Sequence, residues 1–147
     1  MFKHILVPTD GSKLSQKAVN QAIGLARDFQ AKVTALHVFP KFSGSPYGTF
    51  GPAEDLLEEA HRNQAQAESD RLFATLRKSA VAAGVPFEAV LVEHNDVSQQ
   101  VISTAKKKKC DLICMASHGR RGFAGVLLGS ETNKVLTHSD IPVLVLR

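Results

Sequence analysis

Short apolar runs alternate along the chain with stretches whose apolar residues recur every three or four positions. The runs are about 4–8 residues long and are bounded by glycine, proline or polar residues, a pattern typical of strands. Five runs fit this description: Lys3–Val7, Lys32–Phe39, Phe87–Val92, Asp111–Ala116 and Val143–Leu146. We therefore predict five short strands, the first ending before Pro8 and the last opened by Pro142.

The stretches between these runs have helical periodicity. Apolar side chains repeat at helical spacing on one face of each stretch, and glycine marks the end of the longest one. The predicted helices are the stripe Leu14, Ala18, Ala22, Leu25 and Phe29, the long charged segment Glu54–Ala83 with Gly84 as its stop, the stripe Val97, Val101 and Ala105, and Glu131–Thr137. The segment Pro40–Pro52 is predicted to be a long loop, and loops of that length often carry function.

Strands that alternate with helices indicate βαβ units. In such units the strands are parallel and the helices cover both faces of the sheet, which agrees with strands that are apolar almost throughout. The sequence thus predicts an α/β fold, an open five-stranded parallel sheet with helices on both faces. A chain of 147 residues is long enough for one domain, which we expect to span residues 1–147.

The composition is 44% apolar and 22% charged, which excludes disordered and fibrous classes. No stretch approaches the roughly 18 apolar residues of a membrane span, and the run before Pro8 is too short for a signal peptide, so we expect a cytoplasmic protein. The net charge of +4 is concentrated in Lys106–Lys109. Without an aromatic platform or a nucleic-acid motif, this run is interpreted as a solvated helix end and not as a nucleic-acid surface.

The two cysteines, Cys110 and Cys114, lie four positions apart in a segment predicted to be a strand. At strand spacing their Cα atoms are roughly 13 Å apart, beyond the roughly 7 Å limit of a disulfide. They are predicted to be buried thiols. Two cysteines on one strand cannot form a zinc site alone, and the histidines lack ligand spacing such as HExxH.

In open parallel sheets, ligands bind at the carboxyl ends of the strands, where the strand order reverses. PTDGS follows the first strand and MASHG ends the fourth, which places Asp10, Ala116 and Gly119 at such ends. A structural alternative exists for the first turn, because Asp10 could order it and Ser12 could cap the following helix.

The stretch HGRRGFAGVLLGSE, residues 118–131, is rich in glycine but contains neither GxGxxG nor GxxxxGK[ST]. Gly129 and Ser130 stand directly before helical sequence. A cap serine and backbone N–H groups at a helix N-terminus form an anion site, and glycine allows a phosphate to approach the backbone. The alternative is a surface loop in which Gly119, Gly122 and Gly125 form turns and Ser130 caps the helix.

The charged and titratable side chains of this stretch have two interpretations each. Arg120 and Arg121 could reach phosphates, although arginines in a polar loop usually face water. His118 is similar to a catalytic base in a glycine loop, but a hydrogen bond that orders the loop explains it equally well.

With these residues in place, the chain resembles a single-domain universal stress protein, from KHILVPTDGS at the start to LLGSETNKVL and PVLVLR at the end. The ATP-binding members of that family carry G-x2-G-x9-G-[ST] after the fourth strand. Here Ala116, Gly119, Gly129 and Ser130 occupy those positions, so Ala116 is the departure. The resemblance implies a strand order of 3-2-1-4-5, with the nucleotide between strands one and four.

The resemblance also implies roles for individual residues. Asp10 would bind the ribose, the main chain of Val38 would meet the adenine edge, and Gly119, Gly129 and Ser130 would hold the phosphates. The full set of expected nucleotide contacts is Pro8, Thr9, Asp10, Val38, Met115, Ala116, His118, Gly119, Arg120, Gly129, Ser130 and Glu131.

The function implied is an ATP-dependent stress-response regulator with at most slow hydrolysis. Mg²⁺ or Mn²⁺ would arrive with the triphosphate, because the loop has few carboxylates. A homodimer through the last strand is expected, since that strand otherwise exposes unpaired backbone groups. Two alternatives stay open. The first is a dedicated enzyme, but the chain has no GxSxG elbow and no lysine in the loop to support it. The second is a nucleotide-free dimeric scaffold, which is favoured by the departure from the family motif at Ala116.

Overall fold

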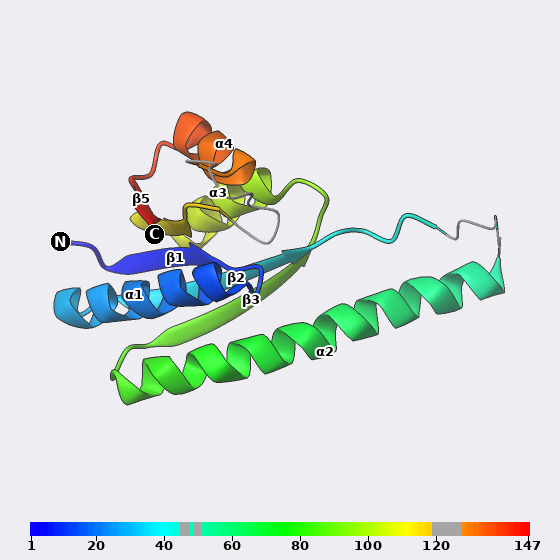
Figure 1. Ribbon diagram of the computed structural model, residues 1–147, viewed down its shortest axis with the longest axis horizontal. Helices are drawn as coiled ribbons and strands as arrows, with labels where there is room; N and C mark the ends of the chain where they lie inside the picture. The colour runs from blue at the N-terminus through cyan, green and yellow to red at the C-terminus, as the bar shows by residue number, and fades with distance from the viewer. Residues whose placement is uncertain (45–47, 49–50, 119–127) are drawn as a thin grey trace.

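The computed structural model describes residues 1–44, 48, 51–118 and 128–147 (Figure 1). All the predicted elements are present, and their ends agree with the prediction to within a few residues. In chain order they are β1 (His4–Pro8), α1 (Lys13–Phe29), β2 (Lys32–Phe39), α2 (Pro52–Ala82), β3 (Phe87–Glu93), α3 (Val97–Lys108), β4 (Leu112–Ala116), α4 (Ser130–His138) and β5 (Val143–Leu146).

The five strands form one parallel sheet in the order β3-β2-β1-β4-β5, which confirms the predicted topology. β1 lies at the centre and is fully buried from His4 to Val7. β3 and β5 are the two edge strands. The run KVTALHVF extends β2 three residues beyond the last residue of β1 with which it pairs, Pro8 opposite Leu36.

Helices cover both faces of the sheet. One apolar cluster joins Ile5, Val7 and Val33 to α1 and α2, including Val19 and Leu76. The other joins the opposite side chains of the same strands to α3 and α4. Alternating residues of β1 thus enter different cores, which is why its sequence is apolar at almost every position.

The lysine run has the structural role that was predicted. Lys106, Lys107 and Lys108 occupy the last turn of α3, and Lys109 follows as its left-handed C-cap with φ 56°. Positive side chains at this end complement the negative end of the helix dipole. Lys106 also forms an ion pair with Asp140 at 2.9 Å.

Both cysteines are buried, free thiols, as predicted. Cys110 precedes β4 and Cys114 lies within it, so the two do not share the strand that was expected. Burial raises the pKa of the Cys110 thiol to about 11 and that of Cys114 to about 12. Both sulfur atoms are therefore protonated and unreactive at neutral pH.

The helix α2 reaches well past the sheet (Figure 1). Its buried residues, Ser69, Phe73, Leu76 and Ala80, all lie in its second half, and residues 52–68 contain none. The contacts of the projecting half include those of His61, whose Nε2 lies 2.7 Å from the Pro40 carbonyl, and of Arg62, whose Nε donates to Glu93 at 2.9 Å. Among the described helices, none has the length and apolar character needed to cross a membrane.

Candidate functional site

The strand order reverses between β1 and β4. The chain runs from β1 outward to β2 and β3, then crosses to β4 and β5 on the other side. The pairing of Ile5 with Leu112 and of Leu6 with Ile113 sets the register. Extended by three residues, this register brings Thr9 level with Ala116. The segments that follow β1 and β4 therefore meet at the carboxyl edge of the sheet, the location of ligand sites in this architecture.

The turn after β1 is held by short-range hydrogen bonds. The Asp10 carboxylate accepts from the Ser12 N–H at 2.9 Å, and the Ser12 hydroxyl accepts from the Ser15 N–H at 3.2 Å. Gly11 has a φ of 78°, which a residue with a side chain rarely adopts. Asp10 thus orders the turn and Ser12 caps α1, as the structural alternative predicted, and the same turn positions Asp10 past the end of the sheet.

Thr9 and Pro8 fix the start of this turn. Thr9 is buried, its N–H donates to the Leu36 carbonyl at 2.8 Å, and its hydroxyl lies 3.0 Å from that of Ser15. Pro8 is the last residue of β1 and has no N–H to donate. Both residues therefore support the position of Asp10. The Thr9 hydroxyl is already hydrogen-bonded to Ser15.

The main chain of Val38 faces the switch point. The Leu36 carbonyl points toward β1, where it accepts from Thr9, while the Phe39 carbonyl points the other way and accepts from His94 at 2.8 Å. Because main-chain groups alternate along a strand, those of Val38 point to the same side as those of Leu36. On that side β1 has already ended. The main-chain N–H and C=O of Val38 therefore offer one hydrogen-bond donor and one acceptor at the carboxyl end of the sheet.

The segment after β4 is joined to the start of α4 by close backbone contacts. The Gly129 N–H donates to the Ser117 carbonyl at 2.6 Å, and the Thr132 hydroxyl donates to the Ala116 carbonyl at 3.0 Å. A Cβ on Gly129 would lie 3.1 Å from the Cα of His118. Glycine is therefore needed here for close approach of two backbone segments. The φ of −69° would suit any residue, so a positive φ is not the reason.

Ser130 does not cap α4, although both interpretations of the sequence made it the cap residue. Gly129 is the N-cap, and Ser130 is the first helical residue, with an exposed side chain. The cap falls one residue earlier because the Gly129 carbonyl accepts the first bond of the helix, from Asn133 at 2.9 Å. The N–H groups of the first turn of a helix lack intrahelical partners, so this turn presents donors and a positive dipole end.

The Glu131 carboxylate is used within the protein. Oε2 accepts from the Ser98 N–H at 2.8 Å, and Oε1 lies 3.0 Å from Lys134 Nζ, which raises the pKa of Lys134. Glu131 thus ties the first turn of α3 to the first turn of α4. This role was missed from the sequence, because Ser98 and Glu131 are 33 positions apart and no motif connects them.

The remaining predicted contacts divide into three groups. Met115 and Ala116 are buried in β4, and the Met115 side chain packs in the core beneath α3 and α4. His118 Nδ1 lies 3.1 Å from the Ser117 hydroxyl, which agrees with the loop-ordering interpretation. Gly119 and Arg120 lie outside the described residues, as do Arg121, Gly122 and Gly125.

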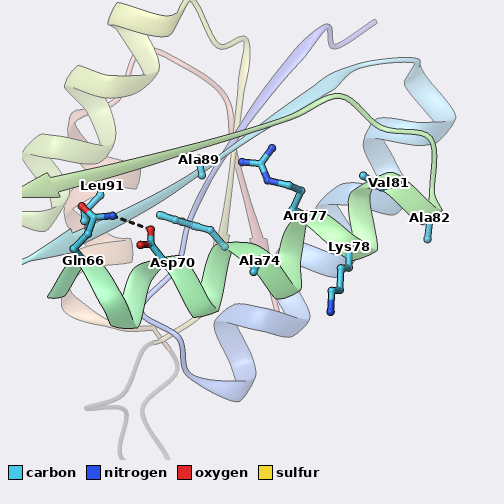
Figure 2. A pocket seen from close by; sticks show the side chains of 10 residues that line it. Gln66, Asp70, Ala74, Arg77, Lys78, Val81, Ala82, Ala89 and Leu91 are labelled. Carbon is cyan, nitrogen blue, oxygen red and sulfur yellow. Dashed lines mark hydrogen bonds between the residues drawn. The ribbon is translucent and has the colours of Figure 1, made fainter. Parts of the chain in front are cut away.

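One hollow in the described surface lies elsewhere. It has a volume of about 780 Å³ and separates the second half of α2 from the edge strand β3 (Figure 2). It is distant from the switch point and contains none of the predicted contact residues. Within residues 1–44, 48, 51–118 and 128–147, no group of three or more His, Cys, Asp or Glu side chains could hold a metal ion.

The fold and the placement of these residues define a doubly wound α/β protein whose candidate ligand site lies at the switch point. The model of the universal stress protein family matches residues 1–147. The chain therefore belongs to the universal stress protein family.

Curated relatives agree with this assignment over the full chain. Universal stress protein MJ0531 of Methanocaldococcus jannaschii is 33% identical over 150 residues, covering 100% of this chain and 83% of its own. Universal stress protein YxiE of Bacillus subtilis is 31% identical over 150 residues, covering 100% of both.

Solved structures share the fold. The universal stress protein UspA of Lactobacillus plantarum has a TM-score of 0.85 and 24% identity over 99% of this chain and 97% of its own. A universal stress protein in complex with cAMP has a TM-score of 0.70 and 24% identity, over 99% and 97%. The universal stress protein of Archaeoglobus fulgidus in complex with dAMP has a TM-score of 0.63 and 20% identity, over 99% and 98%.

Proposed function

We propose that this chain binds ATP at the switch point between β1 and β4. The observation that carries the proposal is the convergence of three features at one edge of the sheet: the main-chain edge of Val38, the Asp10 turn and the N-terminus of α4. A hydrogen-bonding edge, a carboxylate and a helix N-terminus match, in that order, the base, the ribose and the phosphates of a nucleotide.

Each part of the nucleotide has a suitable partner in this proposal. Val38 offers one donor and one acceptor for the adenine edge. Asp10 accepts from the ribose hydroxyls while keeping its bond to the Ser12 N–H. The Ser130 hydroxyl and the free N–H groups of α4 hold phosphate oxygens, and Mg²⁺ or Mn²⁺ is held chiefly by those oxygens, with no protein cage needed.

The family supports the chemical class of the ligand. Two family members with this fold have been solved with cAMP and with dAMP, both adenine nucleotides. Ala116 replaces a motif glycine and adds only a methyl group. Because Ala116 is already buried in β4, with its carbonyl bonded to Thr132, this methyl leaves the junction after β4 intact.

Nucleotide occupancy would act as a regulatory signal and turnover would be slow. The stretch 118–131 contains no lysine to stabilise a transferring phosphoryl group, and the His118 ring nitrogen Nδ1 is bonded to Ser117. A site that binds ground state and transition state equally retains its ligand and does not turn it over. A steady-state hydrolysis rate above about one per second would instead support the enzyme alternative.

The decisive experiment is extraction of nucleotide from the purified protein, followed by ATP titration of the stripped protein. At 100 times its dissociation constant, ATP should stabilise the fold by roughly 2.7 kcal/mol. Asp10→Asn retains an acceptor for Ser12 but loses the charge, and should weaken ATP binding about tenfold or more, since hydrogen bonds to charged groups contribute about 1.5–3 kcal/mol.

The matched control is Asp28→Asn, which neutralises an exposed carboxylate on α1 that pairs with its neighbour Arg27. It should leave ATP affinity unchanged. No copurified nucleotide, together with no thermal shift on ATP addition, would replace this proposal with the nucleotide-free scaffold.

A homodimer through β5 is the second part of the proposal. β5 is an edge strand, Leu144 is 39% exposed, and its neighbours in the strand are partly exposed. Pairing with its two-fold mate would satisfy the open backbone groups of this edge. Leu144→Lys should abolish this pairing and leave the sheet folded, and light scattering gives the mass. An unchanged mass would contradict the β5 interface.

A further inference from the structure

The outer face of α2 exposes apolar side chains that nothing in the described chain covers. Leu56, Leu57 and Val81 are 66%, 44% and 72% exposed, and they account for three of the six large exposed apolar residues in the described part of the molecule. The helix has 31 residues, so it is about 46 Å long. A half helix without buried contacts is only marginally stable in water.

Leu56 and Val81 belong to a seven-residue repeat of exposed positions along α2. Small residues stand at every seventh position, and a second series lies between them, at the spacing of a coiled-coil seam. All members of both series are exposed: Ala53, Ala60, Ala67, Ala74 and Val81 in the first, and Leu56, Asn63, Asp70 and Arg77 in the second. The alanines allow a second helix to approach closely along the whole seam.

The charges of α2 are divided between its two ends. Residues 52–70 contain six acidic side chains, with Arg62 as the only lysine or arginine. Residues 71–82 contain Arg71, Arg77 and Lys78 and no acidic side chain. A parallel helix pair would place like charges together, whereas an antiparallel pair places each acidic half against a basic half.

A hollow is present where the second helix would lie. Figure 2 shows it beside the basic half of α2, with Ala74, Val81 and Ala82 on the helix side and Ala89 and Leu91 on β3. Asp70, at its rim, accepts from Gln66 at 2.8 Å, and Arg77 donates to the Phe87 carbonyl at 3.5 Å. The lining is thus mostly small and apolar with a polar rim, as expected of a surface that receives a helix.

We propose that α2 pairs with α2 of a second copy of this chain in an antiparallel arrangement, across a two-fold axis between Ala67 and Asp70. In this register Leu56 lies opposite the partner's Val81, Ala60 opposite the partner's Arg77, and Ala67 opposite the partner's Asp70. The projecting acidic half of each helix lies along the partner's basic half and beside the partner's hollow. The surface is self-complementary, as a two-fold interface requires.

This interface is separate from the nucleotide site and from β5. α2 and β3 lie at one edge of the sheet and β5 at the other. A chain that uses both edges forms assemblies larger than a dimer, in which α2 pairs join β5 dimers. Nucleotide binding is not required for α2 pairing, so failure of the proposed function leaves this inference unaffected.

Disulfide capture tests the register directly. Leu56→Cys and Val81→Cys are prepared as two separate single variants, mixed and oxidised, with Cys110 and Cys114 buried and out of reach. The mixture should give a covalent dimer that contains one chain of each, and each variant alone should give little. The control mixes Leu56→Cys with Glu68→Cys, an exposed position about 20 Å along the helix from Val81. Dimers of Leu56→Cys with itself, or equal capture in the control, would overturn the antiparallel register.

The mass in solution tests whether the pairing forms in the natural sequence. Ala67→Glu places a carboxylate against the partner's Asp70 and should lower the mass by a factor of about two. Thr75→Glu adds the same charge at an exposed position off the seam and should leave the mass unchanged. Each is measured alone and with Leu144→Lys, so that loss of α2 pairing and loss of β5 pairing are read independently. Equal masses for the natural sequence, Ala67→Glu and Thr75→Glu would overturn the proposal.

Discussion

The turn after β1 and the junction after β4 meet at the same edge of the sheet but are built in different ways. The turn is held by bonds among Thr9, Asp10, Ser12 and Ser15, at most six positions apart. The junction depends on the bond between Thr132 and Ala116, 16 positions apart, and on the bond between Ser98 and Glu131, 33 apart. A local motif therefore forms one half of the site, and tertiary packing forms the other.

This difference determines how each half should respond to substitution. In the turn, a residue can be changed at the cost of one local bond. In the junction, a side chain at Gly129 would displace β4, α4 or the segment between them, because Gly129 meets Ser117 and His118 through backbone atoms. The strongest test of the contrast is therefore at Gly129.

Gly129→Val should destabilise the protein by about 1–3 kcal/mol, the usual cost of overpacking. The new Cβ would lie 3.1 Å from His118 Cα and 3.3 Å from the Ser117 carbonyl oxygen, and backbone atoms cannot move aside as a flexible side chain can. ATP stabilisation should be lost as well, because the N-terminus of α4 shifts. Chemical denaturation with and without ATP measures both effects.

Gly24→Ala is the matched control. A Cβ there would meet nothing within 4 Å, and the residue lies inside α1. Alanine in a helix interior is preferred over glycine by roughly 0.5–1 kcal/mol, so this variant should be more stable. Unchanged stability in Gly129→Val would show that the junction is less tightly packed than the distances indicate.

Ser12 in the turn and Ser130 in the junction give a second comparison of the two halves of the site. Ser12→Ala removes the N-cap of α1 and should cost about 1 kcal/mol of unfolding free energy. Ser130→Ala removes no cap bond and should change stability by less than about 0.5 kcal/mol, while weakening ATP binding. Denaturant midpoints and ATP titrations of both variants separate the two roles. The opposite pattern, with Ser130 stabilising and Ser12 silent, would contradict the assignment of the caps.

The sequence was sufficient for those parts of the molecule whose signals are local. Periodicity identified each helix and strand, and PTDGS identified the turn, because Asp and Ser bond to main-chain groups within a few residues. Ser130 was misplaced by one residue as a possible cap, since GSE does not show which residue's carbonyl begins the helix. The bond from Ser98 to Glu131 could not be predicted, because it depends on how α3 and α4 pack.

The roles of Val38 and Gly129 illustrate the same limit. The apolar pattern shows Val38 only as one residue of a strand. Its main chain is left without a neighbouring strand on the β1 side because β1 ends before β2 does. Gly129 was predicted to let a phosphate approach the backbone, and the sequence did not show that its absent side chain also makes room for the backbone of Ser117 and His118. In both cases the deciding contact joins segments far apart in the sequence.

Ala116→Gly should lower the free energy of unfolding less than Gly129→Val does and by no more than Ser12→Ala does. The residue is buried in β4, and its carbonyl bond to Thr132 does not involve the methyl group. Glycine in a strand interior costs roughly 0.5–1 kcal/mol. ATP affinity should be equal or higher, because the family motif has glycine here. Weaker ATP binding by Ala116→Gly would mean that the methyl group supports the site.

The smallest expected effect lies at the opposite end of the sheet, where His4 is buried at the start of β1. Its Nε2 lies 2.7 Å from the Thr34 hydroxyl and its Nδ1 lies 3.0 Å from the Lys108 carbonyl. Burial, and then the charge of Lys32, lower the pKa of His4 below its ordinary value of 6.5, against weaker opposing effects of the hydrogen bond to the Lys108 carbonyl and of the charges of Glu88 and Asp111. The folded protein therefore binds a proton here less readily than the unfolded chain does.

The sign of the pH dependence follows. Above pH 6.5 His4 is neutral in both the folded and the unfolded state, so it does not lower the free energy of unfolding. As the pH falls through 6.5, the unfolded chain takes up a proton at His4 before the folded protein does. The free energy of unfolding therefore decreases as the pH falls. His4→Gln keeps a side chain that can donate and accept but cannot titrate, so its stability should change less over this window. The other histidines are common to both proteins and cancel in the difference between the two denaturation curves.

Because His4 lies at the amino ends of the strands, His4→Gln should bind ATP at neutral pH as the natural sequence does. Parallel pH profiles for the two proteins would show that His4 is not the group responsible, whereas a loss of ATP affinity would show that the two ends of the sheet are coupled.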